Sequence, residues 1–394
     1  VDAGGGGKVY TVSQSSTITS SWGTDMSNSM NARVVFVLRL CAAWLCCGMA
    51  LTASAREWLI PSPDDGNEAA VTALTNALAN CAEKDVVTLA KGVYDLSGII
   101  SYSNETDSAT HLAVGWRTIT LRGDPSATRD EVVLLGGGAR ILRLGKTKSW
   151  IENITFTNGW AQGAALNGSS RGYGGAVSGA YGEIGDTCSL SNCVFRGNRA
   201  DVHAGAVDGG TLYGCLVESN AATNGVAGAL RYGRAYDTVF RRNEAKSGGA
   251  CHQTTLVRCT LEENAATGNG GACAYNCSAT GCTFRYNSAG ARGGAMNSCR
   301  TLRNCTFIGN SGVNNGGALY DQAGPVSNCW FESNWVSSGG SQGAICANAS
   351  AAVLVQDCMF TNNAAGWSTG VGGNVAVWSN CVFVGNAMRS TGGG

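Results

Sequence analysis

A pattern of apolar and polar positions recurs nine times between residue 193 and residue 386. In most copies a Cys and a Phe stand two positions apart and an Asn follows three positions after the Phe, giving C-x-F-x-x-N. The Asn residues of successive copies lie 21 to 24 residues apart, with one longer interval of 29. Because side chains alternate between the two faces of a strand, the Cys and the Phe point to the same face. The pattern predicts an all-β solenoid, a right-handed single-stranded parallel β-helix of about 23 residues per coil.

Stacking of such coils places equivalent residues directly above one another, about 4.8 Å apart. We therefore expect ladders of Cys and of Phe in the core and a ladder of Asn at a turn. Asn tolerates the left-handed backbone conformation, and its amide can bond to local backbone and to the Asn of the next coil. The predicted ladder residues are Cys193, Phe195, Asn198, Cys215, Asn220, Phe240, Asn243, Cys259, Asn264, Cys282, Phe284, Asn287, Cys305, Phe307, Asn310, Cys329, Phe331, Asn334, Cys358, Phe360, Asn363, Cys381, Phe383 and Asn386.

Two further positions agree with this register. Gly-Gly-Ala segments such as Gly248–Ala250 and Gly293–Ala295 lie between the copies and predict a second tight corner with the Ala turned inward. The position after the Phe is predicted to face solvent, and it alternates in charge through Arg196, Glu218, Arg241, Glu262 and Arg285. Stacked opposite charges form salt bridges of about 0.2–1 kcal/mol each. We expect this ladder to set register more than stability.

The chain before the repeats has the features of a capped start. Residues 68–81 (EAAVTALTNALANC) carry apolar side chains at helical spacing, which predicts an amphipathic helix that covers the open end of the solenoid. Short β-rich segments separated by Gly follow within residues 86–158. We therefore expect a cap with the first coils over residues 56–158 and the repeat β-helix over residues 159–394.

Residues 30–55 have the layout of a secretory signal peptide. Two arginines form a basic start, residues 40–51 are an uninterrupted apolar run, and Ala53-Ser54-Ala55 is a small-x-small cleavage site. The apolar run is shorter than the roughly 20 residues that a membrane-spanning helix needs, so a membrane anchor is the alternative interpretation. We expect export to the extracellular space or the cell outer membrane surface, and a mature protein that lacks residues 1–29.

Composition narrows the classes of function. The chain has 27 basic and 27 acidic side chains, which argues against a nucleic-acid partner. Its apolar content of 44% excludes a disordered chain, so the 57 Gly serve ordered turns.

In-register neighbours in the Cys ladder have Cβ vectors that point the same way, which is poor disulfide geometry. We expect buried free thiols there, with Cys277 and Cys299 outside the ladder as the candidate bridge.

Candidate chemistry is sparse. Enzymes built on such solenoids need convergent carboxylates as acid, base or Ca²⁺ ligands, and the best local group is Asp201, His203 and Asp208. These three are a weak catalytic alternative to a polar corner between strands, so we assign no catalytic site. Cys251 and His252 have Zn²⁺-ligand chemistry, but the Cys stands at a core position. We expect no metal and no cofactor.

Two features interrupt the repeat and predict binding. Gly159 to Tyr173 is an insertion, and long insertions on a rigid scaffold commonly carry function. In the last coils the outward positions become apolar, which predicts a contact surface for a partner or for chain beyond this sequence. These outward positions are Ile308, Trp330, Met359, Val382 and Val384.

The paired C-x-F-x-x-N and Gly-Gly-Ala motifs, over residues 193–394, resemble the repeat of chlamydial-type polymorphic outer membrane proteins. Asp64-Asp65-Gly66, the helical segment and VVTLAKGVYDLSG (residues 86–98) resemble the N-terminal end of pectate-lyase-like β-helix proteins. The first resemblance implies an exported autotransporter passenger that acts at the cell surface as an adhesin. It implies partners on a host-cell or matrix surface, or a polysaccharide.

The sequence departs from that family because it has no C-terminal membrane barrel. It stops at Gly394 within what would be the next Gly-Gly-Ala corner. We therefore expect a C-terminally truncated solenoid, with membrane attachment only through an anchor in the missing part. The function we predict is that of a secreted or surface-displayed β-helix protein with an adhesive or structural role. A polysaccharide lyase or glycoside hydrolase of pectate-lyase-like fold, and an inert structural spacer, are the alternatives.

Overall fold

The computed structural model describes residues 54–104, 107–145, 148–163, 172–179, 188–337, 339–347, 352–366, 372 and 376–388. Almost all of the expected signal peptide and leader lies outside these residues, as does the middle of the insertion at 164–171. Those assignments stay predictions. Residues 55–394 form one compact unit, and its described residues carry the architecture that follows.

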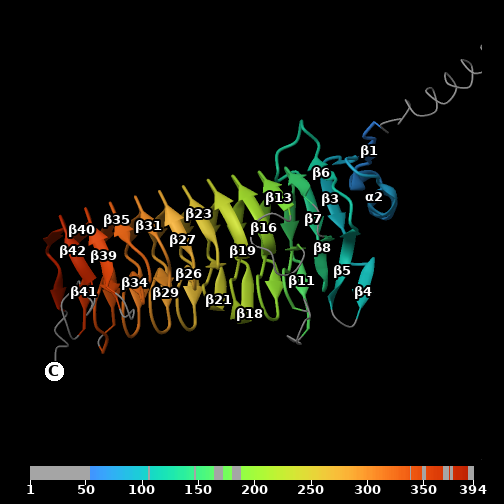
Figure 1. Ribbon diagram of the computed structural model, residues 1–394. Coiled ribbons are helices and arrows are strands. Elements are labelled where there is room, and N and C mark those ends of the chain that lie inside the picture. Colours follow the sequence, from blue (N-terminus) through green and yellow to red (C-terminus); the bar gives the residue numbers. More distant parts are fainter. Residues whose placement is uncertain are drawn as a thin grey trace, which may run out of the picture. The chain divides into compact units, whose positions relative to one another are not determined.

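Within the described residues, the strands form three sheets of 22, 12 and 10 strands, which we name sheets A, B and C. The pairing from coil to coil is parallel, and β4 and β5 form an antiparallel pair near the N-terminal end. One coil runs through two short strands of sheet A, one of sheet B and one of sheet C before it returns to sheet A. Figure 1 shows the strands of successive coils lying side by side. The predicted right-handed parallel β-helix is confirmed.

The strand bounds follow the coil repeat. Sheet A contains β1 (Glu57–Ile60), β2 (Val86–Leu89), β4 (Tyr102–Asn104), β5 (Asp107–Val114), β6 (Thr120–Gly123), β8 (Arg140–Leu144), β9 (Ser149–Glu152), β12 (Val177–Ser178), β13 (Cys188–Ser191), β16 (Val207–Tyr213), β19 (Leu230–Tyr236), β22 (Cys251–His252), β23 (Thr255–Val257), β26 (Cys273–Ala274), β27 (Ser278–Thr280), β30 (Met296–Asn297), β31 (Leu302–Arg303), β34 (Leu319–Tyr320), β35 (Val326–Ser327), β38 (Ile345–Cys346), β39 (Val353–Gln356) and β42 (Ala376–Ser379). Sheet B contains β3 (Gly92–Asp95), β7 (Val132–Leu135), β10 (Thr155–Thr157), β14 (Val194–Arg196), β17 (Leu216–Glu218), β20 (Val239–Arg241), β24 (Thr260–Glu262), β28 (Thr283–Arg285), β32 (Thr306–Ile308), β36 (Trp330–Glu332), β40 (Met359–Thr361) and β43 (Val382–Val384). Sheet C contains β11 (Trp160–Ala161), β15 (Arg199–Ala200), β18 (Ala221–Val226), β21 (Glu244–Ser247), β25 (Ala265–Ala266), β29 (Ser288–Ala289), β33 (Ser311–Gly312), β37 (Trp335–Val336), β41 (Ala364–Ala365) and β44 (Ala387–Met388).

A helical cap covers the N-terminal end of the solenoid, as predicted. The short 3-10 helix η1 (Pro63–Asp65) leads into α2 (Asn67–Asn80). The apolar side of α2 is buried, with Leu74 fully inaccessible to solvent, and the helix packs on β1, β2, β3 and β5. Arg117 donates to the carbonyl of Ala79 at 3.0 Å and places its positive charge at the carboxyl end of the helix, where the helix dipole favours a cation.

The inward ladders are seen in ring stacking and burial along the described coils, except at Phe383, which stacks on Phe360 with centroids 5.1 Å apart but is 49% exposed. Phe284, Phe307, Phe331 and Phe360 stack with ring centroids 4.7 to 4.8 Å apart and interplanar angles of 2° to 7°. This spacing equals the distance between coils, so each ring packs flat on the next. The ladder Cys thiols are buried, apart from the half-buried Cys381.

The Asn ladder is seen in its bonding. Asn287 is fully buried, and its Nδ2 donates to Oδ1 of Asn310 at 2.9 Å and to the carbonyl of Leu261 at 2.9 Å. The left-handed residue is the one before the Asn, as at Tyr286 with φ 55°. Because that residue points to solvent, it makes the turn while the Asn amide points inward to its neighbours. The sequence analysis placed the Asn ladder at a turn, and the structure gives the left-handed conformation of that turn to the residue before the Asn.

The Gly-Gly-Ala corner needs its two Gly for different reasons. Gly270 has a φ of +66°, which disfavours other residues. A Cβ on Gly271 would lie 2.0 Å from the carbonyl oxygen of Gly294 in the next coil, so the close approach of two backbones excludes a side chain. Ala272 is fully buried, as predicted.

The charge ladder forms as two segments. Arg196 Nε donates to Glu218 Oε1 at 2.6 Å, and Arg241 bonds to the other oxygen of Glu218. Arg285 Nε donates to Glu262 Oε2 at 2.6 Å. Glu218 differs from the prediction because it is only 9% exposed, since both Arg side chains cover it. Burial raises its pKa, but the hydrogen bonds from the two guanidinium groups outweigh that effect and leave the pKa below its usual value.

The candidate disulfide is not formed. Cys277 and Cys299 are both free and buried, with each Sγ donating to a backbone carbonyl of its own coil at 3.4 and 3.3 Å. They occupy equivalent positions on neighbouring coils, so their Cβ vectors point the same way, as in the ladder. The prediction of a bridge between them was wrong for that geometric reason.

Candidate functional site

The three residues of the weak catalytic alternative lie close in the chain but serve separate contacts. Asp201, which follows β15, accepts hydrogen bonds from Trp160 Nε1 at 2.8 Å and from the backbone of Gly163 at 3.0 Å. His203 Nδ1 accepts from a backbone N–H at 3.1 Å, and Asp208 on β16 forms an ion pair with Arg231. The structure describes all three, and no hydrogen bond joins any two of them.

Burial keeps the imidazole of His203 neutral. Desolvation, reinforced by the positive charge of Arg231, lowers the pKa of His203 to about 4. Its Nδ1 is occupied as an acceptor, and its ring stacks on Tyr173 with centroids 4.9 Å apart. Asp208 and Arg231 are each only 4% exposed and are joined by two hydrogen bonds of 2.7 and 3.0 Å. The contacts of these residues hold neighbouring coils together.

A second buried ion cluster was missed by sequence reasoning. Arg140 is fully buried and donates to Asp107 at 2.8 Å, while Arg143 donates to the other oxygen of Asp107 at 2.6 Å. Arg140 also donates to the carbonyl of Tyr173 at 2.8 Å. The signal was a pair of Arg residues within the apolar segment ARILRL, at 139–144. Their partner carboxylate precedes them by about one coil, which the sequence did not reveal.

The side chains considered for Zn²⁺ do not converge. Cys251 is fully buried in the core, whereas His252 lies on the outer face, because successive strand residues point to opposite sides. His252 stacks on Tyr275 with centroids 5.8 Å apart, and its Nδ1 is buried without a hydrogen-bond partner. In the part of the chain that the structure describes, no three His, Cys, Asp or Glu side chains are grouped for a metal ion.

The predicted apolar surface divides into two rows. Trp330, Met359 and Val382 are in register on β36, β40 and β43, and they are 42%, 42% and 52% exposed. Ile308 and Val384 lie in the neighbouring outward row, where Glu332 and Thr361 separate them. The contiguous apolar surface is therefore the row of three, and its role in binding stays a prediction.

A hollow on the outer face of sheet A was not predicted. It has a volume of about 160 Å³ and lies over β9, β13, β16 and β19. We name it the aromatic hollow, and it is lined by Lys148, Trp150, Cys188, Ser189, Thr211, Tyr213, Arg234 and Tyr236. Parallel register explains its shape, because Trp150, Ser189, Thr211 and Arg234 follow one another from coil to coil in one row.

Bulky and small side chains in that row create the recess. Ser189 and Thr211 form a low floor two coils long, with Trp150 beyond one end and Arg234 beyond the other. Tyr213 and Tyr236 stack along one side with centroids 5.3 Å apart and an interplanar angle of 8°. Sequence reasoning could have noted that these two Tyr recur one coil apart. It had no means of placing Trp150 beside them.

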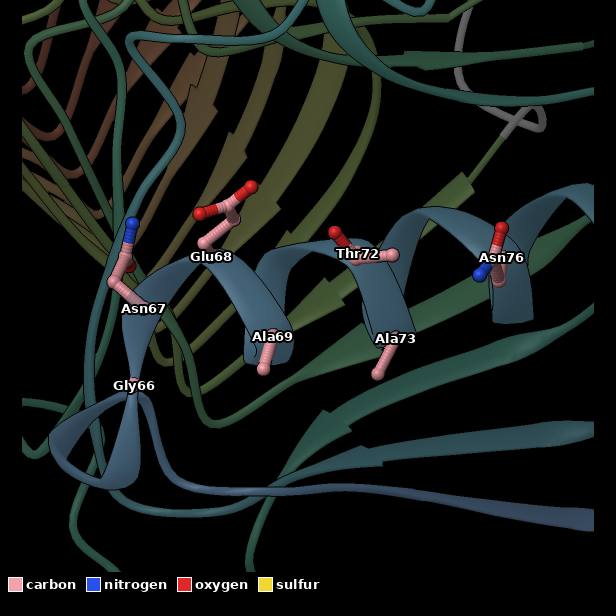
Figure 2. Close-up of a pocket in the computed structure, with 7 residues that line it drawn as sticks. All are labelled: Gly66, Asn67, Glu68, Ala69, Thr72, Ala73 and Asn76. Atoms are coloured by element: carbon pink, nitrogen blue, oxygen red, sulfur yellow. The ribbon is translucent and has the colours of Figure 1, made fainter.

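A larger hollow lies over the exposed side of the cap. It measures about 750 Å³ and is lined by residues of α2 and the Gly66 before it. Figure 2 shows Ala69 and Ala73 projecting from one side of the helix, with Glu68 and Thr72 on another. Its lining residues include one carboxylate and neither an aromatic ring nor a cation, so it offers few groups for specific recognition.

Among the described residues, no helix is both long enough and apolar enough to span a membrane.

Comparison with known proteins identifies the repeat. A Chlamydia polymorphic membrane protein (Chlamydia_PMP) repeat matches residues 304–322, which include Cys305, Phe307, Asn310 and the Gly-Gly-Ala corner of one coil. The chain therefore carries a match to this repeat within the parallel β-helix described above. No curated protein matches the chain.

Several solved structures are similar at low identity. A mannuronic acid specific polysaccharide family 6 lyase from human gut microbiota is 13% identical, with 83% of each chain covered and a TM-score of 0.41. Geobacillus virus E2 ORF18 is 11% identical, with 92% of this chain and 66% of that chain covered and a TM-score of 0.39. The GH87 alpha-1,3-glucanase catalytic unit from Streptomyces thermodiastaticus is 13% identical, with coverages of 86% and 70% and a TM-score of 0.39.

Proposed function

We propose that this chain is an exported, surface-displayed β-helix that acts in adhesion. The observation that carries the proposal is the polymorphic membrane protein repeat at residues 304–322, set in a solenoid of equivalent coils. The expected signal peptide at residues 30–55 would supply export. The proposed partners are a host-cell or matrix surface, or a polysaccharide.

The division of labour between inward and outward positions supports this role. Inward positions repeat the same residues, as in the Phe stack, and they hold the coils at constant spacing. Outward positions on the same strands change from coil to coil, as from Arg285 to Ile308 to Glu332. A repeated core therefore provides a rigid scaffold whose outer face can vary without loss of packing, which suits a binding surface.

Adhesion can be tested with the full chain coupled to fluorescent beads. We expect several-fold more beads to be retained on cultured epithelial cells or on extracellular matrix than beads carrying the same amount of heat-unfolded chain. Equal retention of the two kinds of bead would refute adhesion and favour the structural spacer.

Surface display needs a separate measurement. An epitope tag placed after residue 56, downstream of the expected cleavage site, should be removed when intact source cells are treated with protease. Lysed cells provide the control for cleavage of the tag itself. Protection of the tag in intact cells, with cleavage after lysis, would contradict surface display.

A further inference from the structure

We propose that the part of the solenoid between residues 92 and 275 opens in mild acid, because protonation of its histidines breaks contacts between coils. The chain has three His residues, and all of them lie in this part, at His111, His203 and His252. In each of them the fold leaves one ring nitrogen with no place for a second proton. This acid switch is independent of the proposed adhesive role.

His111 on β5 is fully inaccessible to solvent and joins two other segments of the chain. Its Nδ1 donates to the carbonyl of Ile99 at 2.6 Å, so the neutral ring carries its proton on Nδ1. Its Nε2 then accepts from the backbone N–H of Gly137 at 3.1 Å. A second proton, on Nε2, would face this N–H, so a protonated His111 requires the corner at Gly137 to move away.

His203, which follows β15, holds the next coil in the same way. Its Nδ1 accepts from the backbone N–H of Val226 on β18 at 3.1 Å, so this nitrogen carries no proton in the closed coil. A Cβ on Gly225 would lie 2.3 Å from the same nitrogen, which places this segment directly against the ring. A proton on Nδ1 would set two N–H donors face to face and push the segment away.

His252 on β22 lacks an acceptor for a second proton. Its Nδ1 is buried, and none of the described residues forms a hydrogen bond with it. The ring meets Tyr232 edge to face and stacks on Tyr275, with centroids 6.4 and 5.8 Å away. A proton on Nδ1 would therefore leave a buried N–H without an acceptor, which is costly in free energy.

The surroundings of His111 favour the neutral ring. Desolvation lowers the pKa of His111, and this effect outweighs the hydrogen bond to Ile99 and the attraction of Asp95. The other titratable side chains on β5 and on the elements packed against it are Asp107, Arg140, Arg143, Glu68 and Tyr102. Burial therefore decides the charge of this ring.

The surroundings of His203 and His252 also favour neutral rings. Desolvation and the positive charge of Arg231 lower the pKa of His203 to about 4, against the attraction of Asp208. Desolvation lowers the pKa of His252 as well and outweighs the effect of Cys277. Arg231 is in register with His252 and pairs with Asp208, so that carboxylate is already neutralised. Other titratable side chains that contact the two rings are Tyr173, Tyr232 and Tyr275.

The three folded pKa values therefore lie below the value of about 6.5 that His has in an unfolded chain. As the pH falls through this value, an opened coil takes up protons that the closed coil refuses, so the closed form loses stability. For His203 the loss is spread between about pH 6.5 and its folded pKa of about 4. At about pH 5 these two values give an open population about 30-fold larger than at neutral pH.

The acid switch is confined to one part of the molecule. No His follows residue 252 in the sequence, and the stacked rings from Phe284 to Phe360 lie in this His-free part. Each coil contacts only its neighbours, so some coils can open while others stay paired. Mild acid should therefore release the segments at Gly137 and Val226 and leave the coils around Phe307 closed.

The test is hydrogen exchange of the full chain at about pH 7.5 and about pH 5, read by mass spectrometry and corrected for the effect of pH on the intrinsic exchange rate. Both values lie above the ordinary pKa of Asp and Glu, which is about 4. We expect peptides that contain Val226 to lose about 30-fold in protection at the lower pH. Peptides that contain Gly137 should lose protection as well, and peptides from residues 305–337 should keep theirs.

Two variants connect the loss of protection to the rings. His203→Gln keeps an oxygen that can accept from Val226 but does not titrate, so its Val226 peptides should be equally protected at both pH values. His252→Phe keeps a ring against Tyr275 and removes both nitrogens, so it should reduce the loss in peptides around residue 252. Arg303→Gln, at an exposed position in the His-free part, is the control and should respond to pH as the wild type does. Unchanged unfolding temperatures at about pH 7.5 would show that the variants fold.

The proposal is overturned if the Val226 peptides of the wild type are equally protected at both pH values, or if peptides from residues 305–337 lose as much protection as they do. A loss in His203→Gln equal to that of the wild type overturns it as well. If His203→Gln does not fold, His252→Phe decides, because an undiminished loss around residue 252 in that variant refutes the role of the rings.

Discussion

Replacement of one ladder Asn should destabilise the solenoid by an amount that its bonds define. The side chain of the buried Asn287 donates to Leu261 and Asn310, and its Oδ1 accepts from both the backbone N–H and the side-chain Nδ2 of Asn264 at 3.0 Å. Asn287→Ala leaves the buried N–H of Asn264 without this acceptor, which costs about 1–3 kcal/mol, and removes three further bonds of about 0.5–1.5 kcal/mol each. The expected loss in the free energy of unfolding is about 5 kcal/mol, within a range of about 2.5–7.5 kcal/mol.

Urea unfolding of the full chain, followed by circular dichroism, measures this loss. The control is Asn314→Ala, because Asn314 is exposed and its φ is not positive, and we expect a change below about 0.5 kcal/mol. Hydrogen exchange should also show faster exchange in peptides from the coils on either side of Asn287, since each coil contacts only its neighbours. If the free energies of unfolding of Asn287→Ala and Asn314→Ala differ by less than about 1 kcal/mol, the Asn ladder does not stabilise the fold as argued.

Three further predictions follow from burial and charge. Asp208→Asn breaks the buried ion pair with Arg231 and should lower the free energy of unfolding by about 3–5 kcal/mol. Asp237→Asn breaks the exposed pair with Arg258 and should lower it by less than about 1 kcal/mol. Equal losses for the two variants in urea unfolding would refute the distinction between buried and exposed pairs. Hydrogen bonds from Trp58 and from backbone N–H groups lower the pKa of Asp85 to about 2. The ionised carboxylate therefore stabilises the fold fully above pH 4, which is about the pKa of Asp in an unfolded chain. This stabilisation is lost as the pH falls from about 4 to about 2. The unfolding temperature of Asp85→Asn should therefore depend less on pH in that window than the unfolding temperature of the wild-type chain. The same dependence on pH in both proteins would contradict this prediction. Among the fifteen described thiols, half-buried Cys381 should be alkylated first under native conditions, and earlier labelling of a fully buried thiol, read by mass spectrometry, would argue against the packed Cys ladder.

The differences between the sequence interpretation and the structure share a physical cause. Periodicity identified a turn at each ladder Asn, but two adjacent residues can adopt the left-handed conformation there. The structure assigns it to Tyr286 rather than Asn287, because an Asn whose amide is used for bonds between coils must point inward. Glu218 was expected in solvent because its strand position is outward. The two Arg side chains that bury it belong to other coils, and their conformations depend on packing that no linear pattern contains.

The aromatic hollow depended on register more than on motif. Tyr213 and Tyr236 follow the coil period, but Trp150 precedes the regular repeat, and an insertion lies between them. Only the pairing of β9 with β13, and of β13 with β16, places Trp150 in the row that contains Thr211 and Arg234. The predicted apolar surface changed for the same reason, since register put Ile308 and Val384 in a different row from Trp330.

The sequence by itself determined the class of fold, the coil length, the cap and the identity of the inward ladders. It could do so because each of these depends on local alternation and on a repeat that any stack of coils must satisfy. The tertiary structure decided the partners of the buried charges, the free state of Cys277 and Cys299, and the aromatic hollow. These features join residues from different coils, and their geometry follows from the register across an irregular insertion, which no local pattern specifies.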